Sequence, residues 1–199
     1  MKFFKKSELS HILEKMRVLD IIMQPKEDAW LRLINLCCLE NAKKYVIANG
    51  SGDELVIYIT ENGVYIKGFD HENEYNQFAA EVLDSNFFEQ IYKNAPKEFL
   101  DLLEGEEKEE TTFCMWNIGQ TDEWQENKVG DGEEDGGKDY LLSYICKDAE
   151  QWHTWAEEYY DIELDITIIQ RIYAGEDVVE DDIRGLNPDR DVEEVFEEI

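Results

Sequence analysis

The chain has 199 residues, of which 43% are hydrophobic and 12% aromatic, so it can bury a core and intrinsic disorder is not expected. Its 48 acidic residues outnumber 19 basic ones, and the formal net charge is −29. Such a surface repels nucleic-acid phosphates and anionic membranes, because binding to them needs basic groups. The composition therefore predicts no nucleic-acid or membrane partner, and favours either solubility alone or a basic protein partner.

The sequence predicts a cytoplasmic protein with reduced thiols. Its four cysteines lack the paired spacing of zinc or redox sites. The first residues reach polar side chains before any apolar stretch long enough for a secretory leader. No run approaches the roughly 18 apolar residues of a membrane span.

The first third of the chain is predicted to be helical. Apolar residues at spacings of four, three and four predict a helix over residues 7–23, which Pro25 ends. Residues 28–42 carry a second apolar stripe that favours a helix, although a buried strand could look similar. The charge also changes after this region, from +3 over residues 1–50 to −32 over residues 51–199.

The clearest local pattern is a β-hairpin. Two runs rich in β-branched and aromatic residues, Glu54–Thr60 and Val64–Phe69, flank Glu61, Asn62 and Gly63. Asn-Gly is a strong signal for a tight turn between strands. A third strand over residues 44–48 is expected to join the hairpin.

The remaining periodicities complete an α+β fold with a mostly antiparallel sheet of five to six strands and helices packed on one face. We expect a single domain over residues 1–199, with residues 1–40 as an alternative helical lid or N-terminal extension. The further elements are short helices on either side of Pro96, strands over 111–119, around 124–129 and over 140–146, and helices over 148–161, 165–175 and 189–199. Asp148 with Gln151 resembles a capping box at the start of the first of these three helices, and Gly175 closes the second.

Three carboxylates and an imidazole follow the hairpin, in the stretch from Asp70 to Glu74. Asp and Asn side chains bond to nearby backbone and start turns, so a plain turn is the first interpretation. A lone histidine beside acids lacks the second imidazole typical of metal sites, so no metal is expected. Recognition of a partner by an exposed loop is the third interpretation.

Two further acidic segments are candidate sites. The loop over residues 130–139 resembles an EF-hand loop, but Leu142 stands where the motif needs a bidentate Glu. The C-terminal helix has a polar face that is almost entirely acidic, which suits either solvent or a basic groove.

The sequence contains no phosphate-binding loop, nucleophile elbow or paired metal histidines. We therefore expect a non-enzymatic binding protein without a cofactor, which engages a basic partner through its acidic surface. The alternative is a carboxylate-based hydrolase or metal-dependent enzyme that uses the Asp70-His71-Glu72 region. The candidate partner-binding residues are Asp70, His71, Glu72, Glu133, Glu134, Asp135, Glu193, Glu194, Glu197 and Glu198.

Four short phrases, "IKGFDHENE", "TFCMW", "WAEEYYDIEL" and "LNPD", carry a resemblance. Between Lys44 and Pro188 the chain resembles small acidic bacterial proteins of largely unassigned function, which we connect with the immunity proteins of polymorphic toxin systems. The resemblance implies a cytoplasmic protein that covers the active site of a toxin domain. The acidic charge of the chain favours a nuclease toxin, because the phosphate-binding groove of a nuclease suits negative charge. It assigns no functional residue.

Overall fold

The computed structural model describes residues 4–80, 85–119, 123–129 and 134–199. The chain divides into two compact units. Unit 1 comprises Met1–Lys6 and Leu36–Tyr144, and unit 2 comprises Ser7–Asn35 and Ile145–Ile199. The single domain expected from the sequence stays a prediction. Within the described ranges, no helix is both long and apolar enough to cross a membrane.

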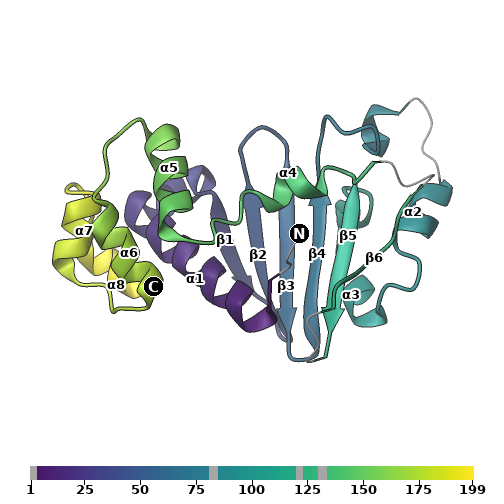
Figure 1. Cartoon of the computed structure of the whole chain (residues 1–199), viewed down its shortest axis with the longest axis horizontal. Coiled ribbons are helices and arrows are strands. Elements are labelled where there is room, and N and C mark those ends of the chain that lie inside the picture. Colours follow the sequence, from purple (N-terminus) through teal and green to yellow (C-terminus); the bar gives the residue numbers. More distant parts are fainter. Residues whose placement is uncertain (1–3, 81–84, 120–122, 130–133) are drawn as a thin grey trace. The chain divides into compact units, whose positions relative to one another are not determined.

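The sheet has six strands whose spatial order follows the chain, as Figure 1 shows. The α+β class with an antiparallel sheet is therefore confirmed. The strands are β1 (Ile34–Cys38), β2 (Ala42–Ala48), β3 (Glu54–Thr60), β4 (Gly63–Phe69), β5 (Phe113–Ile118) and β6 (Gln125–Glu126).

The hairpin predicted from Asn62 and Gly63 is formed by β3 and β4. Its register pairs Ile59 with Val64 next to the turn and Glu54 with Phe69 at the open end. Strand β2 joins on the other side of β3, as predicted. Because side chains alternate along a strand, this register decides which residues share each face of the sheet.

Two helices of unit 1 cover one face of the sheet: α2 (Ser85–Ile91) and α3 (Lys97–Leu102). Phe99 of α3 stacks on Tyr65 of β4, with ring centroids 5.3 Å apart. A third helix, α4 (Lys138–Leu142), reaches the opposite face, where Leu141 lies beside Gly68. The core under α2 and α3 consists of Val56, Tyr58, Tyr65, Phe87, Ile91, Phe99, Leu103, Cys114 and Trp116.

The acidic segment "GEEKEE", residues 105–110, packs partly against the sheet of unit 1. Residues Gly105–Lys108 form the 3₁₀ helix η3. Glu107 pairs with Lys44 and accepts a hydrogen bond from the Tyr58 hydroxyl at 2.9 Å. Because these contacts occupy its carboxylate, Glu107 is not available to a partner.

Unit 2 consists mainly of helices, and two of the helix ends lie where the sequence predicts them. The Asp148 side chain accepts a hydrogen bond from the backbone N–H of Gln151, and Gly175 ends a helix at a φ of 90°. Both ends were predicted. The helices are α1 (Lys6–Met23, in unit 2 from Ser7 onward), η1 (Lys26–Leu31), α5 (Ala149–Tyr160), α6 (Ile166–Ala174), α7 (Glu180–Leu186) and α8 (Val192–Glu198).

Two predicted elements are wrong in type. Residues Ile34–Cys38, expected as part of a helix, form strand β1 because they pair with β2 in the sheet. Residues 140–146, expected as a strand, begin inside helix α4. The Asp135 carboxylate starts that helix by accepting the backbone N–H groups of Gly137 and Asp139, each at 2.9 Å. Helix α7 was not predicted, and the strand expected around residues 124–129 is reduced to Gln125–Glu126.

The C-terminal helix is present as α8, but its four glutamates are not equivalent. Glu193 and Glu197 are exposed. Glu194 accepts a hydrogen bond from the guanidinium of buried Arg190 at 2.6 Å, and Glu198 pairs with buried Arg32. The expectation that all four belong to a solvated face is therefore wrong for Glu194 and Glu198.

We expect Glu198→Ala to lower the free energy of unfolding by about 2 kcal/mol, because it leaves the Arg32 guanidinium buried without its carboxylate. The loss stays below that of a fully buried pair because Glu198 is partly exposed. Glu197→Ala is the matched control and should change stability by less than about 0.5 kcal/mol. Urea unfolding measures both, and equal effects would contradict the assigned pairing.

Candidate functional site

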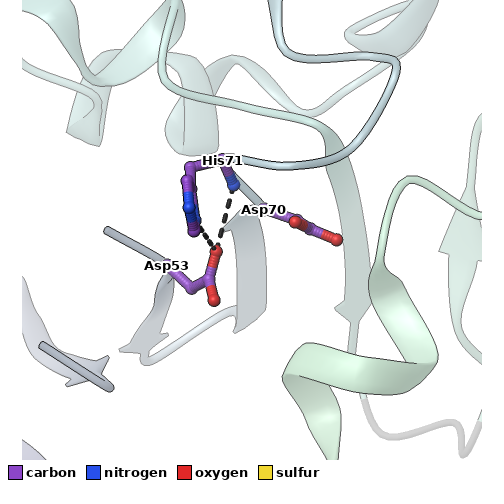
Figure 2. Close-up of side chains that lie close together, drawn as sticks. All are labelled: Asp53, Asp70 and His71. Atoms are coloured by element: carbon purple, nitrogen blue, oxygen red, sulfur yellow. Dashed lines mark hydrogen bonds and ion pairs between the residues drawn. The ribbon is translucent and has the colours of Figure 1, made fainter. Parts of the chain in front are cut away.

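The candidate site lies at the open end of the β3–β4 hairpin in unit 1. Because Glu54 pairs with Phe69, the next residues outward, Asp53 and Asp70, emerge from the two strands at the same end. Figure 2 shows Asp53, Asp70 and His71 together, with two interactions joining Asp53 to His71. The hairpin register thus brings a carboxylate from before β3 to the imidazole after β4.

Asp53 is the anchor of this site, and only 5% of it is exposed. Its Oδ1 accepts the backbone N–H of His71 at 3.0 Å and lies 2.7 Å from the imidazole Nδ1. Its Oδ2 accepts hydrogen bonds from Asn49 at 2.7 Å and from the Tyr140 hydroxyl at 3.1 Å. Burial acts to raise the pKa of Asp53, but the bonds from His71 and Asn49 outweigh it and hold this pKa below its usual value.

His71 is oriented by Asp53 and remains partly open to solvent. The hydrogen bond to Asp53 raises the pKa of His71 above its ordinary value. When Nδ1 donates this bond, the neutral imidazole carries its lone pair on Nε2. Nε2 lies 3.9 Å from Glu72 Oε1. The pair therefore has the arrangement of a carboxylate that positions a histidine base.

Asp70 contributes a second carboxylate, which points away from the Asp53–His71 interaction in Figure 2. Its Oδ1 accepts the backbone N–H of Glu72 at 3.1 Å. A Cβ on Gly137 would lie 2.4 Å from Asp70 Oδ2, which is closer than an ordinary contact. Position 137 therefore requires glycine. One donor atom from each of Asp53, Asp70 and His71 lies within 4.8 Å of the other two.

An open pocket of about 500 Å³ adjoins these residues. No lysine or arginine is among its described lining residues, so its walls are strongly negative. The lining residues are Asp53, Asp70, Glu72, Asn73, Glu74, Glu134 and Tyr140.

The structure brings together only some of the candidate partner-binding residues. Asp70, Glu72 and Glu134 line the pocket, and His71 is bonded to Asp53, which also lines it. The Asp135 carboxylate instead accepts the backbone N–H groups of Gly137 and Asp139 at the start of α4. Glu133 lies outside the described residues. The four candidates on α8 belong to unit 2.

The stretch after β4 is a turn as well as part of this site. The backbone N–H of Asn73 bonds to the Asp70 carbonyl at 3.2 Å, as the first interpretation predicted. Asp53, Asn49 and Tyr140 complete the site, and no local sequence pattern marked them as part of it. Counting outward from a two-residue Asn62-Gly63 turn would have placed Asp53 opposite Glu72, because the register of a tight hairpin follows from its turn. The structure instead pairs Ile59 with Val64, and this register places Asp53 opposite Asp70.

No family model, curated protein or solved structure matches this chain. The comparisons therefore add nothing to the resemblance to immunity proteins. The charge of the chain and the chemistry of the pocket are the observations that bear on its function.

Proposed function

We propose that this chain is a non-enzymatic binding protein that engages a basic partner protein through its acidic surface. The observation that carries the proposal is the charge of both units. Unit 1 has 25 acidic and 11 basic residues, and unit 2 has 23 acidic and 8 basic residues. Because each unit has such an excess, either one attracts a basic protein and repels an acidic one.

The rim of the unit 1 pocket is the surface best suited to this contact. Glu72, Glu74 and Glu134 are exposed, and the Glu72 side chain is 86% accessible. A lysine or arginine of a partner that enters this pocket meets carboxylates on several sides. Paired charges of this kind give specificity and rapid encounter more than they give affinity.

A nuclease toxin domain is the partner type that fits best, and the protein would act as its immunity-type inhibitor. The phosphate-binding groove of such an enzyme is basic, because it must neutralise a polyanion. An acidic protein that covers this groove blocks the substrate with the same charges that attract it. The resemblance noted in the sequence points to the same class of partner.

The test uses the basic protein that co-purifies with this chain from its host, and measures association and dissociation rates. We expect the association rate to fall roughly tenfold or more between 0.1 and 0.5 M salt, while dissociation changes less. Glu72→Lys/Glu74→Lys should slow association more than Glu193→Lys/Glu197→Lys, which adds the same charge to α8. Glu194 and Glu198 are left intact because they pair with buried arginines.

Rates that are insensitive to salt and to both double variants would show that the acidic surface serves solubility alone. If the α8 variant slowed association more than the pocket variant, the partner would contact unit 2. In that case the rim of the pocket would not be the binding surface.

A second candidate is a hydrolase, favoured by the 2.7 Å contact between Asp53 and His71. Within the described residues the pocket has no serine, threonine or cysteine in its lining, so His71 would activate water directly. Ester, peptide and phosphodiester substrates test this candidate, with His71→Gln as the comparison. Turnover that is equal in the two proteins, or absent from both, eliminates it.

A further inference from the structure

The donor atoms at the open end of the hairpin form a mixed set of one imidazole and two carboxylates. From this set we infer that Asp53, Asp70 and His71 bind a divalent transition-metal ion, for which Zn²⁺ and Mn²⁺ are suitable probes. The inference is independent of the proposed function. It also reverses the expectation of no metal, which rested on a lone histidine considered without Asp53.

The distances suit a single ion after a small rearrangement. Zinc bonds to histidine nitrogen and carboxylate oxygen are about 2.0–2.2 Å long, so two ligands of one ion lie roughly 3–4 Å apart. His71 Nδ1 and Asp53 Oδ1 are 2.7 Å apart, and one donor atom from each of Asp53, Asp70 and His71 lies within 4.8 Å of the other two. Rotation of the partly exposed Asp70 side chain would close the remaining gap.

This group differs from a run of surface acids because a nitrogen ligand and a buried carboxylate face each other in it. Hydrogen bonds from Asn49 and Tyr140 to Oδ2 hold the Asp53 carboxylate in place. Hydrogen bonds of this kind orient the ligands of protein metal sites and are part of their design. Asp53 and His71 are thus positioned before an ion arrives. Asp70, whose Oδ1 accepts the backbone N–H of Glu72, has to rotate toward them.

Binding changes the tautomer of His71 and needs no other reagent. Without an ion, the Nδ1 proton lies in the hydrogen bond to Asp53. With an ion, the Nδ1 lone pair bonds to the metal and the proton is carried on Nε2, so the imidazole stays neutral. Asp53 and Asp70 supply two negative charges that offset the charge of the ion. Glu72, Glu74 and Glu134 remain at the pocket rim, and they raise the local concentration of cations.

Calorimetric titration of Zn²⁺ and Mn²⁺ into the protein tests the inference. We expect one stoichiometric ion, with affinity at least tenfold weaker in Asp70→Asn and in His71→Gln. Glu193→Gln is the matched control, since it removes the same charge as Asp70→Asn from an exposed position in unit 2. It should bind as the wild type does.

Paramagnetic broadening by Mn²⁺ gives a second readout. The chain has only three histidines, and the imidazole signals of His71 should broaden at substoichiometric Mn²⁺ before those of His11 and His153. Circular dichroism establishes that each variant is folded, and His71→Gln carries the test alone if Asp70→Asn is not. Weak binding of several ions that neither variant changes, or a stoichiometric site that survives both, would overturn the inference.

Discussion

Gly68→Val is expected to lower the free energy of unfolding by on the order of 3 kcal/mol or more, because the site has no room for a side chain. A Cβ built on Gly68 would lie 2.1 Å from Phe113 Cε1 and 2.8 Å from Leu141 Cδ1. Both neighbours are buried, and Phe113 is the partner of Gly68 in the β4–β5 register. The added methyl groups must therefore move α4 or open the sheet beside the candidate site.

Gly68→Ala should show a smaller loss of the same kind, since it adds one carbon in place of three. Gly50→Ala is the control: its Cβ would meet nothing within 4 Å, and only its φ of 74° opposes the substitution. We expect that control to cost about 1 kcal/mol. Urea unfolding measures all three variants. A Gly68→Val protein within 1 kcal/mol of the wild type would mean that β4 and β5 do not approach as described.

The second large effect concerns Asp20, which is fully buried in unit 2. Burial raises the pKa of its carboxyl to about 7, although the hydrogen bond from the Ile34 N–H and the charge of Arg32 act against the shift. The folded chain thus keeps a proton that the unfolded chain releases near pH 4. Stability from this group is complete at low pH and falls by about 4 kcal/mol as the pH rises from about 4 to 7.

Asp20→Asn should remove this slope, because asparagine does not ionise and can still accept the Ile34 N–H. We expect the difference in unfolding free energy between wild type and variant to shift by about 2.5 kcal/mol between pH 5 and pH 8, in favour of the variant at pH 8. Urea unfolding at the two values measures it, and groups that titrate alike in both proteins cancel. An unchanged difference would mean that the pKa of Asp20 in the folded chain is not near 7.

Local patterns predicted the elements whose stability depends on neighbours in sequence. The Asn62-Gly63 turn identified the β3–β4 hairpin, and the spacing of Ile12, Met16 and Leu19 identified α1. The Asp148 cap marked the start of α5. In each case the signal and the structure it specifies lie within a few residues of each other.

Local patterns failed where distant segments decide the conformation. Ile34–Cys38 has an apolar stripe that suits a helix or a strand, and pairing with β2 makes it a strand. The apolar run from Tyr140 resembles a strand, but the Asp135 cap and the glycines after it start a helix. Buried partners likewise set the roles of the α8 glutamates, since nothing near Glu198 in the sequence points to Arg32.

The sequence by itself determined the net charge, the α+β class and the hairpin, because these follow from composition and from patterns a few residues long. It also marked Asp70, His71 and Glu72 as chemically notable. Only the tertiary structure decided that His71 bonds to Asp53 and that Tyr140 and Asn49 hold the same carboxylate. These contacts join residues up to 87 positions apart, Asp53 and Tyr140 being the extreme. Contacts at such separations form only when strand register and helix packing bring the segments together, and local propensity encodes neither.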